Sequence, residues 1–225
     1  SGSLSGSPVT FTATGTAGAA SKLAFTTQPG GGAAGSAWSV QPVVEVQDSY
    51  GNRTTSTASV TVAIGTNAGS GTLAGTATLS AVGGVATFSG LSINKAGTGY
   101  TLTAASTGLT GATSSAFNVT ASNAATIALN AGDNQSATVG TAVGTVPSVI
   151  VKDANGNVVA GVSVTFAVAT GAGTVNPTTA VTTDANGIAA VTSWTLGTTA
   201  GTNTLTATSG SLSGSPVTFT ATGTA

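Results

Sequence analysis

The feature that most constrains this chain is a perfect internal repeat. Residues 1–17, SGSLSGSPVTFTATGTA, recur without a change at residues 209–225, which gives a period of 208 residues. A repeat of this kind predicts a tandem array whose folded units stack on one another. We therefore interpret residues 1–17 as the last strand of a preceding repeat. Away from that repeat, Val9 and Phe11 are expected to be exposed beside unpaired backbone groups.

A weaker repeat divides the period into two domains. The segment VEVQDSYGN at residues 44–52 resembles VIVKDANGN at residues 149–157. Near the domain ends, FNVTA at residues 117–121 resembles VTFTA at residues 217–221. The sequence therefore predicts two homologous domains, residues 18–121 and residues 122–225, each close to the common domain size of about 100 residues.

Hydrophobic periodicity in both domains is that of β-strands. Apolar residues alternate with Thr, Ser and Ala along residues 60–64 and 162–168, and Gly, Asn and Asp recur at intervals of about ten residues. About seven short strands in a hundred residues are typical of an immunoglobulin-like sandwich. The connection at residues 120–125 contains no Gly or Pro and is too short for a flexible coil. We predict an all-β chain of two tandem immunoglobulin-like β-sandwiches in a rod-like arrangement.

Two details of the second domain can be predicted from the alternation. Val217 and Phe219 in its last strand should both face the core. Val191 and Trp194 are three residues apart, so an unbroken strand would place them on opposite faces. Either a bulge separates them or Trp194 is exposed, and we favour the bulge.

The combined motifs resemble the bacterial immunoglobulin-like domain of group 1, the repeat of invasin- and intimin-type surface adhesins. They are Val-x-Val-x-Asp-x-x-Gly-Asn at residues 149–157, Val-x-Val-x-Phe at residues 162–166, TDANG at residues 183–187 and Leu-x-Ala at residues 205–207. The first domain departs from the pattern, with AVGG at residues 81–84 in place of the Asp-x-Asn-Gly turn. The resemblance implies an extracellular stalk module on the bacterial cell surface, whose cell-binding function lies in another domain.

Composition excludes several classes of function. The chain has no His, Cys or Met, so hydrolases with a His base, Cys/His zinc sites and thiol redox chemistry are not expected. The four basic residues are scattered singly, which argues against nucleic-acid binding. No apolar run approaches the ~20 residues of a membrane-spanning helix, so no membrane insertion is predicted for this segment.

The acidic residues are predicted to have structural roles. Asp48 and Asp153 each precede a Gly by three residues, a spacing typical of a turn that the Asp side chain caps. The alternative is calcium bound at a domain end, which requires several carboxylates together. Only Glu45 and Asp48 lie within three residues of one another, and alternation places them on opposite faces, while Asp133 and Asp184 are isolated. We predict no enzyme activity, no cofactor and no metal site.

The aromatic residues Trp38, Tyr50, Tyr100 and Trp194 have two interpretations. They are expected to fill the core or a domain junction, because a sandwich poor in Phe and Leu needs a few large side chains. The alternative is a platform on which a glycan stacks.

The sequence thus favours an extracellular structural spacer of a bacterial surface adhesin or fibre. Its partners would be neighbouring repeats of the same polypeptide or other copies in a fibre, with no nucleic acid. The alternatives are a self-assembling filament or sheath subunit and a carbohydrate-binding accessory module of a secreted enzyme.

Overall fold

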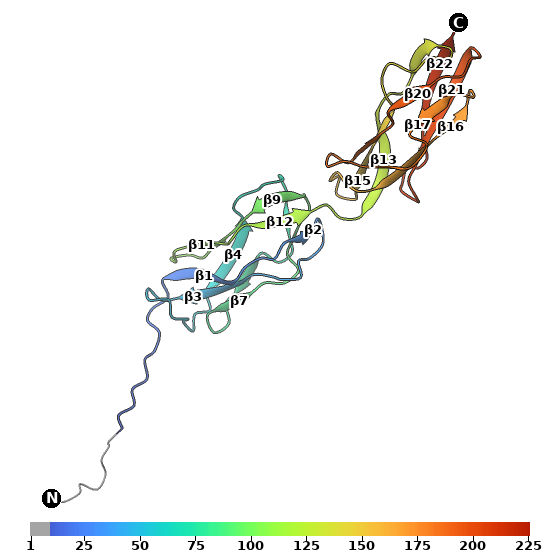
Figure 1. The fold of residues 1–225 in the computed structure, drawn as a ribbon. Coiled ribbons are helices and arrows are strands. Elements are labelled where there is room, and N and C mark those ends of the chain that lie inside the picture. Colours follow the sequence, from blue (N-terminus) through green and yellow to red (C-terminus); the bar gives the residue numbers. More distant parts are fainter. Residues whose placement is uncertain (1–9) are drawn as a thin grey trace, which may run out of the picture.

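A computed structural model describes residues 10–225 of the chain and contains two β-domains joined end to end (Figure 1). The buried residues form two separate cores, and we call residues 18–121 domain 1 and residues 122–225 domain 2. Residues 10–225 contain no helix, and therefore none that could cross a membrane. The predicted all-β class is confirmed.

Domain 1 is built from twelve short strands that form two main layers and a small ribbon. One layer is the sheet β1-β3-β7, and the other is divided into the sheets β11-β10-β4-β6 and β2-β12-β9. The ribbon is β5-β8. The strands are β1 (Lys22–Thr27), β2 (Gly32–Ala33), β3 (Val43–Gln47), β4 (Ser59–Ile64), β5 (Leu73–Ala74), β6 (Thr78–Ser80), β7 (Val85–Thr87), β8 (Ser92–Ile93), β9 (Gly97–Tyr100), β10 (Leu102–Ala105), β11 (Ala112–Thr113) and β12 (Phe117–Thr120).

Domain 2 has the same layers with longer strands. Its first sheet is β13-β15-β19, its second is the continuous sheet β14-β22-β21-β16-β18, and its ribbon is β17-β20. In domain 1 two shorter strands, β9 and β10, take the place of β21. In the same way, β11 and β12 take the place of β22. The strands are β13 (Ala124–Ala131), β14 (Gln135–Thr138), β15 (Ser148–Asp153), β16 (Ser163–Thr170), β17 (Thr174–Asn176), β18 (Val181–Thr182), β19 (Ile188–Ala190), β20 (Ser193–Thr195), β21 (Gly201–Thr208) and β22 (Val217–Thr224).

The register of the last strands corrects the sequence alignment of the two domains. Thr120 pairs in parallel with Ala33, and Thr224 pairs in the same way with Thr138. Thr120 and Thr224 are therefore equivalent. The predicted match of residues 117–121 with residues 217–221 is wrong by four residues, because strands built from Thr, Ala and Val resemble one another at several offsets.

Each domain buries its own hydrophobic core. In domain 1 the inward positions of β3 and β4, such as Val44 and Val60, have no exposed surface, and in domain 2 the same is true of Val149 and Leu205. The outward positions of β4 and β21 are largely Thr, Ser and Ala, which suit both the strand conformation and water, whereas β3 and β15 carry Glu45, Gln47 and Lys152 outward. The core therefore follows the predicted alternation.

The predictions for the second domain's aromatic core are confirmed in part. Val217 and Phe219 are 7% and 0% exposed, as predicted. Val191 and Trp194 are both buried, so the alternative of an exposed Trp194 is wrong. A bulge is not what allows both side chains to be buried. Instead the strand ends after Ala190 in one sheet, and a new strand begins at Ser193 in the β17-β20 ribbon.

Residues 10–17 run away from the end of domain 1 that is remote from domain 2 (Figure 1). They are exposed and belong to no strand. Phe11 is 90% exposed, as the sequence predicts. Val9 lies outside the described residues.

A matched pair of substitutions tests this contrast. Phe219→Ala removes a fully buried ring and should lower the free energy of unfolding of domain 2 by about 3–5 kcal/mol. Phe11→Ala changes the same residue of the identical 17-residue segment and should change stability by less than about 0.5 kcal/mol. Urea denaturation of the two variants measures both values, and equal losses would contradict the assigned environments.

Candidate functional site

The turn at residues 153–157 lies at the junction between the two domains. Oδ1 of Asp153 accepts the N–H groups of Asn155 and Asn157, both at 2.8 Å, and Oδ2 accepts Nδ2 of Asn157 at 2.9 Å. Gly156 supplies the positive φ, 78°, that closes the turn. The predicted capping role of Asp153 is confirmed.

The same carboxylate also holds the linker between the domains. The N–H and the hydroxyl of Ser122 donate to Oδ2 of Asp153 at 2.9 and 3.1 Å. Ser122 stands two residues after Thr120, the last residue of β12. The chain leaving domain 1 is therefore bound to domain 2 almost immediately.

Asn157 connects the turn to domain 1. Its Oδ1 accepts the N–H of Ala96 at 3.0 Å, and its Nδ2 donates to the carbonyl of Asn94 at 3.1 Å as well as to Asp153. Both amide hydrogens and the amide oxygen are thus used. The side chain is 8% exposed, so replacing it would leave buried groups unpaired.

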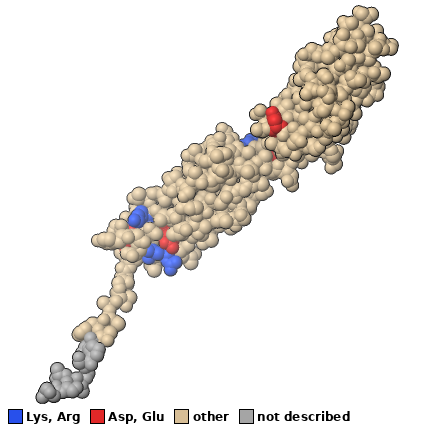
Figure 2. Space-filling model, viewed as in Figure 1, with Lys and Arg blue, Asp and Glu red and all other residues tan. Residues whose placement is uncertain are grey.

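Asn155 makes a second set of contacts with domain 1. Nζ of Lys95 donates to its carbonyl at 2.6 Å, and its Nδ2 donates to the carbonyl of Ala34 at 3.2 Å. A Cβ on Gly35 would come within 2.7 Å of the Asn155 amide, so a glycine at residue 35 permits this approach. Figure 2 shows charged atoms on the visible face at this junction and at the outer end of domain 1.

Domain 1 carries the same turn at its outer end. Oδ1 of Asp48 accepts the N–H groups of Tyr50 and Asn52, both at 2.9 Å, and Oδ2 accepts Nδ2 of Asn52 at 3.0 Å. The N–H of Gly18 donates to Oδ2 at 2.9 Å, as Ser122 does in domain 2. The outer end of domain 1 is therefore built like the side of the junction that domain 2 contributes.

These hydrogen bonds shift the titration of the carboxylates. Donation from the Asn52 side chain, and from the N–H groups of Gly18, Asn52 and Tyr50, lowers the pKa of Asp48 from 3.8 to about 2, although burial opposes this. Burial raises the pKa of Asp153 most strongly, but donation from Asn157, Ser122 and Asn155 outweighs it, so the pKa is lowered. Both turns therefore favour the ionised carboxylate.

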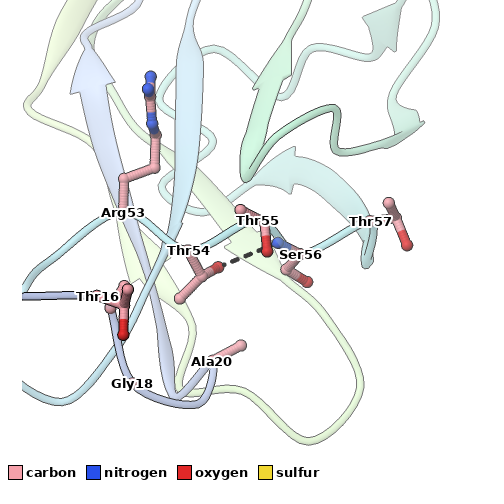
Figure 3. A pocket seen from close by; sticks show the side chains of 9 residues that line it. Thr16, Gly18, Ala20, Arg53, Thr54, Thr55, Ser56 and Thr57 are labelled. Carbon is pink, nitrogen blue, oxygen red and sulfur yellow. Dashed lines mark hydrogen bonds between the residues drawn. The ribbon is translucent and has the colours of Figure 1, made fainter.

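Beside the Asp48 turn lies an open groove of about 770 Å³ (Figure 3). Residues 16–18 and Ala20 line it together with residues 53–57. In Figure 3 the segment Arg53–Thr57 runs past Thr16, Gly18 and Ala20, and the N–H of Ser56 donates to the Thr54 hydroxyl at 3.3 Å. The lining offers hydroxyls and one guanidinium, and no carboxylate.

The other acidic residues serve local structure. Oδ1 of Asp184 accepts the N–H groups of Asn186 and Ile188 at 2.8 and 2.9 Å, which caps a third turn. Oδ1 of Asp133 accepts the N–H of Thr220 in β22 at 2.7 Å. Glu45 accepts a hydrogen bond from the Gln47 amide at 3.2 Å.

The aromatic residues separate into core and surface. Trp38, Tyr100 and Trp194 are at most 3% exposed, so they fill the cores as predicted and offer no face to a glycan. Tyr50 is 90% exposed, so a core position is wrong for this residue. It occupies the place in the Asp48 turn that Asn155 has in the Asp153 turn.

Sequence reasoning did not identify Lys95, Asn155 and Asn157 as contacts between the domains. The recurrence of Asn at residues 52 and 157 was the visible signal. The partners of these asparagines are backbone groups of another domain, and no residue pattern marks those.

The Asp48 hydrogen bonds predict a dependence of stability on pH. Because the folded pKa is about 2 and the unfolded value is near 3.9, the stabilisation is complete above about pH 4 and is lost as the pH falls toward 2. Asp48→Asn should be less stable than the parent at pH 6 and should lose less stability between pH 4 and pH 2. Urea denaturation across this range measures both, and parallel curves for parent and variant would contradict the assignment.

Calcium is not expected to stabilise either turn. Within residues 10–225 no group of three or more His, Cys, Asp or Glu side chains is arranged to hold a metal ion. Adding EDTA should therefore leave the melting temperature unchanged. A drop of several degrees that calcium restores would show that Asp153, Asp133 or Asp184 had been misinterpreted.

Comparison with known proteins supports the fold of the second domain. Residues 126–222 match the family model described as the bacterial Ig-like domain (group 1). No curated protein sequence matches the chain.

Solved structures of bacterial surface proteins resemble the whole chain weakly. FdeC, an Escherichia coli adhesin, is 21% identical over 91% of this chain with a TM-score of 0.47, and this chain spans 65% of its length. The D00-D0 domain of intimin is 16% identical over 91% of this chain and 99% of its own, with a TM-score of 0.45. The S-layer protein rSbsC is 17% identical over 92% of this chain and 28% of its own, with a TM-score of 0.42.

The family assignment rests on the domain model and on the sandwich that the same residues form. Residues 126–222 of this chain match the bacterial Ig-like domain of group 1 in sequence and form a β-sandwich.

Proposed function

We propose that this chain is a structural spacer of a bacterial cell-surface protein, an extracellular stalk segment without enzymatic activity. The observation that carries the proposal is the junction, where one carboxylate and two asparagines bind the linker and both domains. Four hydrogen bonds connect the residue 153–157 turn to domain 1. A spacer must keep its domains from folding back on one another, and these contacts oppose that motion.

The strength of the junction follows from its hydrogen bonds. Each contributes about 1 kcal/mol to stability, and those to buried groups cost more to break. Domains within a chain otherwise move freely unless their interface is large. Because the linker N–H at Ser122 is also bound, the two domains are held within two residues of the last strand of domain 1.

The repeat supports a longer array. Residues 1–17 are identical to the segment that closes domain 2, so we propose that they close a preceding copy of that domain. The Asp48 turn would then form a second junction of the same kind, with Tyr50 in the position of Asn155. Near-zero net charge, −1 over 225 residues, keeps such an array free of self-repulsion.

Small-angle X-ray scattering on residues 18–225 tests the spacer. The parent should give an elongated particle with a narrow distance distribution. Asn157→Ala removes two contacts with domain 1 and should broaden that distribution. The matched control is Asn52→Ala, which loses the same hydrogen bond to its Asp but touches no second domain. A compact parent particle, or an equal effect of both variants, would contradict the proposal.

A further inference from the structure

The second and the last strand of each domain lie side by side and run in the same direction. In domain 1 these strands are β2 and β12, and in domain 2 they are β14 and β22. We call each of these an end-strand pair, because one strand lies near the start of its domain and the other closes it. The two end-strand pairs differ in length.

The end-strand pair of domain 2 is the longer one. All four residues of β14 pair with residues 221–224 of β22. The N–H of Val139 then donates to the carbonyl of Thr224 at 2.8 Å. On its other edge β22 pairs with β21 without interruption from Val217 to Gly223. The final residues of domain 2 are therefore held on both edges.

The end-strand pair of domain 1 is short. Both residues of β2 pair with β12, and the N–H of Ala34 donates to the carbonyl of Thr120 at 2.8 Å. Gly31 and Gly35, with φ of 66° and 76°, lie on either side of this segment. A positive φ departs from the extended strand conformation, so the glycine-rich sequence limits the length of this pair.

The last strand of domain 1 is also interrupted. Residues 114–116 separate β11 from β12, and in this gap the Ser114 hydroxyl accepts the N–H of Leu102 at 2.9 Å. The pairing of β12 with β9 runs from Phe117 to Val119 and shifts register after Phe117. Domain 1 thus closes with two short strands, where domain 2 closes with one long strand.

A pull along the chain loads each end-strand pair lengthwise. Residues 10–17 and β22 lie at opposite ends of the molecule (Figure 1), so tension enters a domain through its first strands and leaves through its last. In a parallel pair these two pulls act in opposite directions along the strands. The hydrogen bonds run between the strands, so they share the load and must break together. Because each bond is weak alone, the resistance depends on how many act at once.

The first strands of the two domains differ less. β1 pairs with β3 from Lys22 to Thr27, and β13 pairs with β15 from Ala124 to Ala131. Both pairings contain a register shift. The difference in resistance is therefore expected at the second and last strands, and both of these are shorter in domain 1.

We propose that the chain is a tension-bearing element in which domain 1 unfolds first when the chain is stretched, while domain 2 stays folded. This role rests on the proposed spacer function, which sets the direction of the load along the chain. Unfolding of residues 18–121 releases about 300 Å of extended chain. A sudden pull is then absorbed as lengthening of domain 1. Because domain 1 has a hydrophobic core of its own, it can refold when the tension falls.

Single-molecule force spectroscopy of the full chain, held by its two ends, tests the order of unfolding. Two unfolding steps are expected. The step of domain 1 should occur at about half the force of the other, because two paired residues carry the load that four carry in domain 2. The two domains are nearly equal in length, so each step has to be assigned with a label.

A flexible insertion labels each domain. Gly108 lies between β10 and β11, and Gly210 lies between β21 and β22; both have positive φ, 75° and 44°, and open space at the Cβ position. About 20 Gly and Ser residues inserted after either glycine should lengthen the step of that domain alone by about 70 Å. The insertion after Gly108 should lengthen the weaker step, and the insertion after Gly210 the stronger one. The reverse assignment, or two steps at equal force, would overturn the proposal.

A pair of substitutions in domain 2 separates the end-strand pair from general stability. Val139→Pro removes the N–H that bonds to Thr224 and should lower the unfolding force of domain 2 toward that of domain 1. The matched control is Val164→Ala, which leaves a cavity at a fully buried position of β16, away from the end strands. It should reduce resistance to urea with a smaller loss of force. Loss of force in proportion to lost stability in both variants would overturn the proposal. Scattering on residues 18–225 is measured without load, so it tests the spacer independently.

Discussion

The rest of the structure depends on one interaction, an aspartate carboxylate that accepts several N–H groups at the start of a turn. At Asp153 those donors come from the turn itself and from the linker, so one side chain fixes both a local conformation and the approach of the neighbouring domain. Charge-assisted bonds of this kind are stronger than neutral ones. Of the five acidic residues in the chain, Asp48 and Asp153 each cap a turn and also bind the segment that enters their domain.

Because one carboxylate fixes both a turn and the neighbouring segment, a sequence so poor in charged and aromatic residues can still hold a defined shape. The strands need only alternate Val, Leu or Phe inward with Thr and Ser outward, and the sandwich follows from burial. Orientation between domains needs directional contacts, and asparagine amides supply them. At the junction, Asn157 uses both amide hydrogens and the amide oxygen in hydrogen bonds. A hydrophobic side chain of similar size could make none of these bonds.

The sequence predicted the parts of the structure that periodicity and turn chemistry control. Alternation indicated the buried positions Val217 and Phe219, and the repeated Asp-x-x-Gly spacing indicated both capped turns. It did not predict that the chain passes from one sheet to another between Val191 and Trp194. A break in the strand and a bulge both allow two apolar residues three positions apart to be buried, so the sequence does not distinguish them. It placed the last strands four residues out of register, since Thr- and Ala-rich strands align with one another at several offsets. It missed Lys95 and Asn155 because their partners are backbone carbonyls and amides of the other domain, and any sequence supplies those.

The two Asp turns differ in a way that bears on how repeats would follow one another. The Asp153 turn presents Asn155 to domain 1, where Lys95 donates to its carbonyl. The Asp48 turn presents Tyr50, and the corresponding end of domain 2, TLGTTA at residues 195–200, carries no charge. An aromatic ring suits a surface of small uncharged residues, whereas the amide of the Asn155 side chain donates to the carbonyl of Ala34, a bond that the ring of Tyr50 could not replace in the same way. Under the proposed array, the junction within a period and the junction between periods are therefore chemically distinct. Each domain would be matched to one neighbour, which favours strict alternation of the two domains over random stacking of either one.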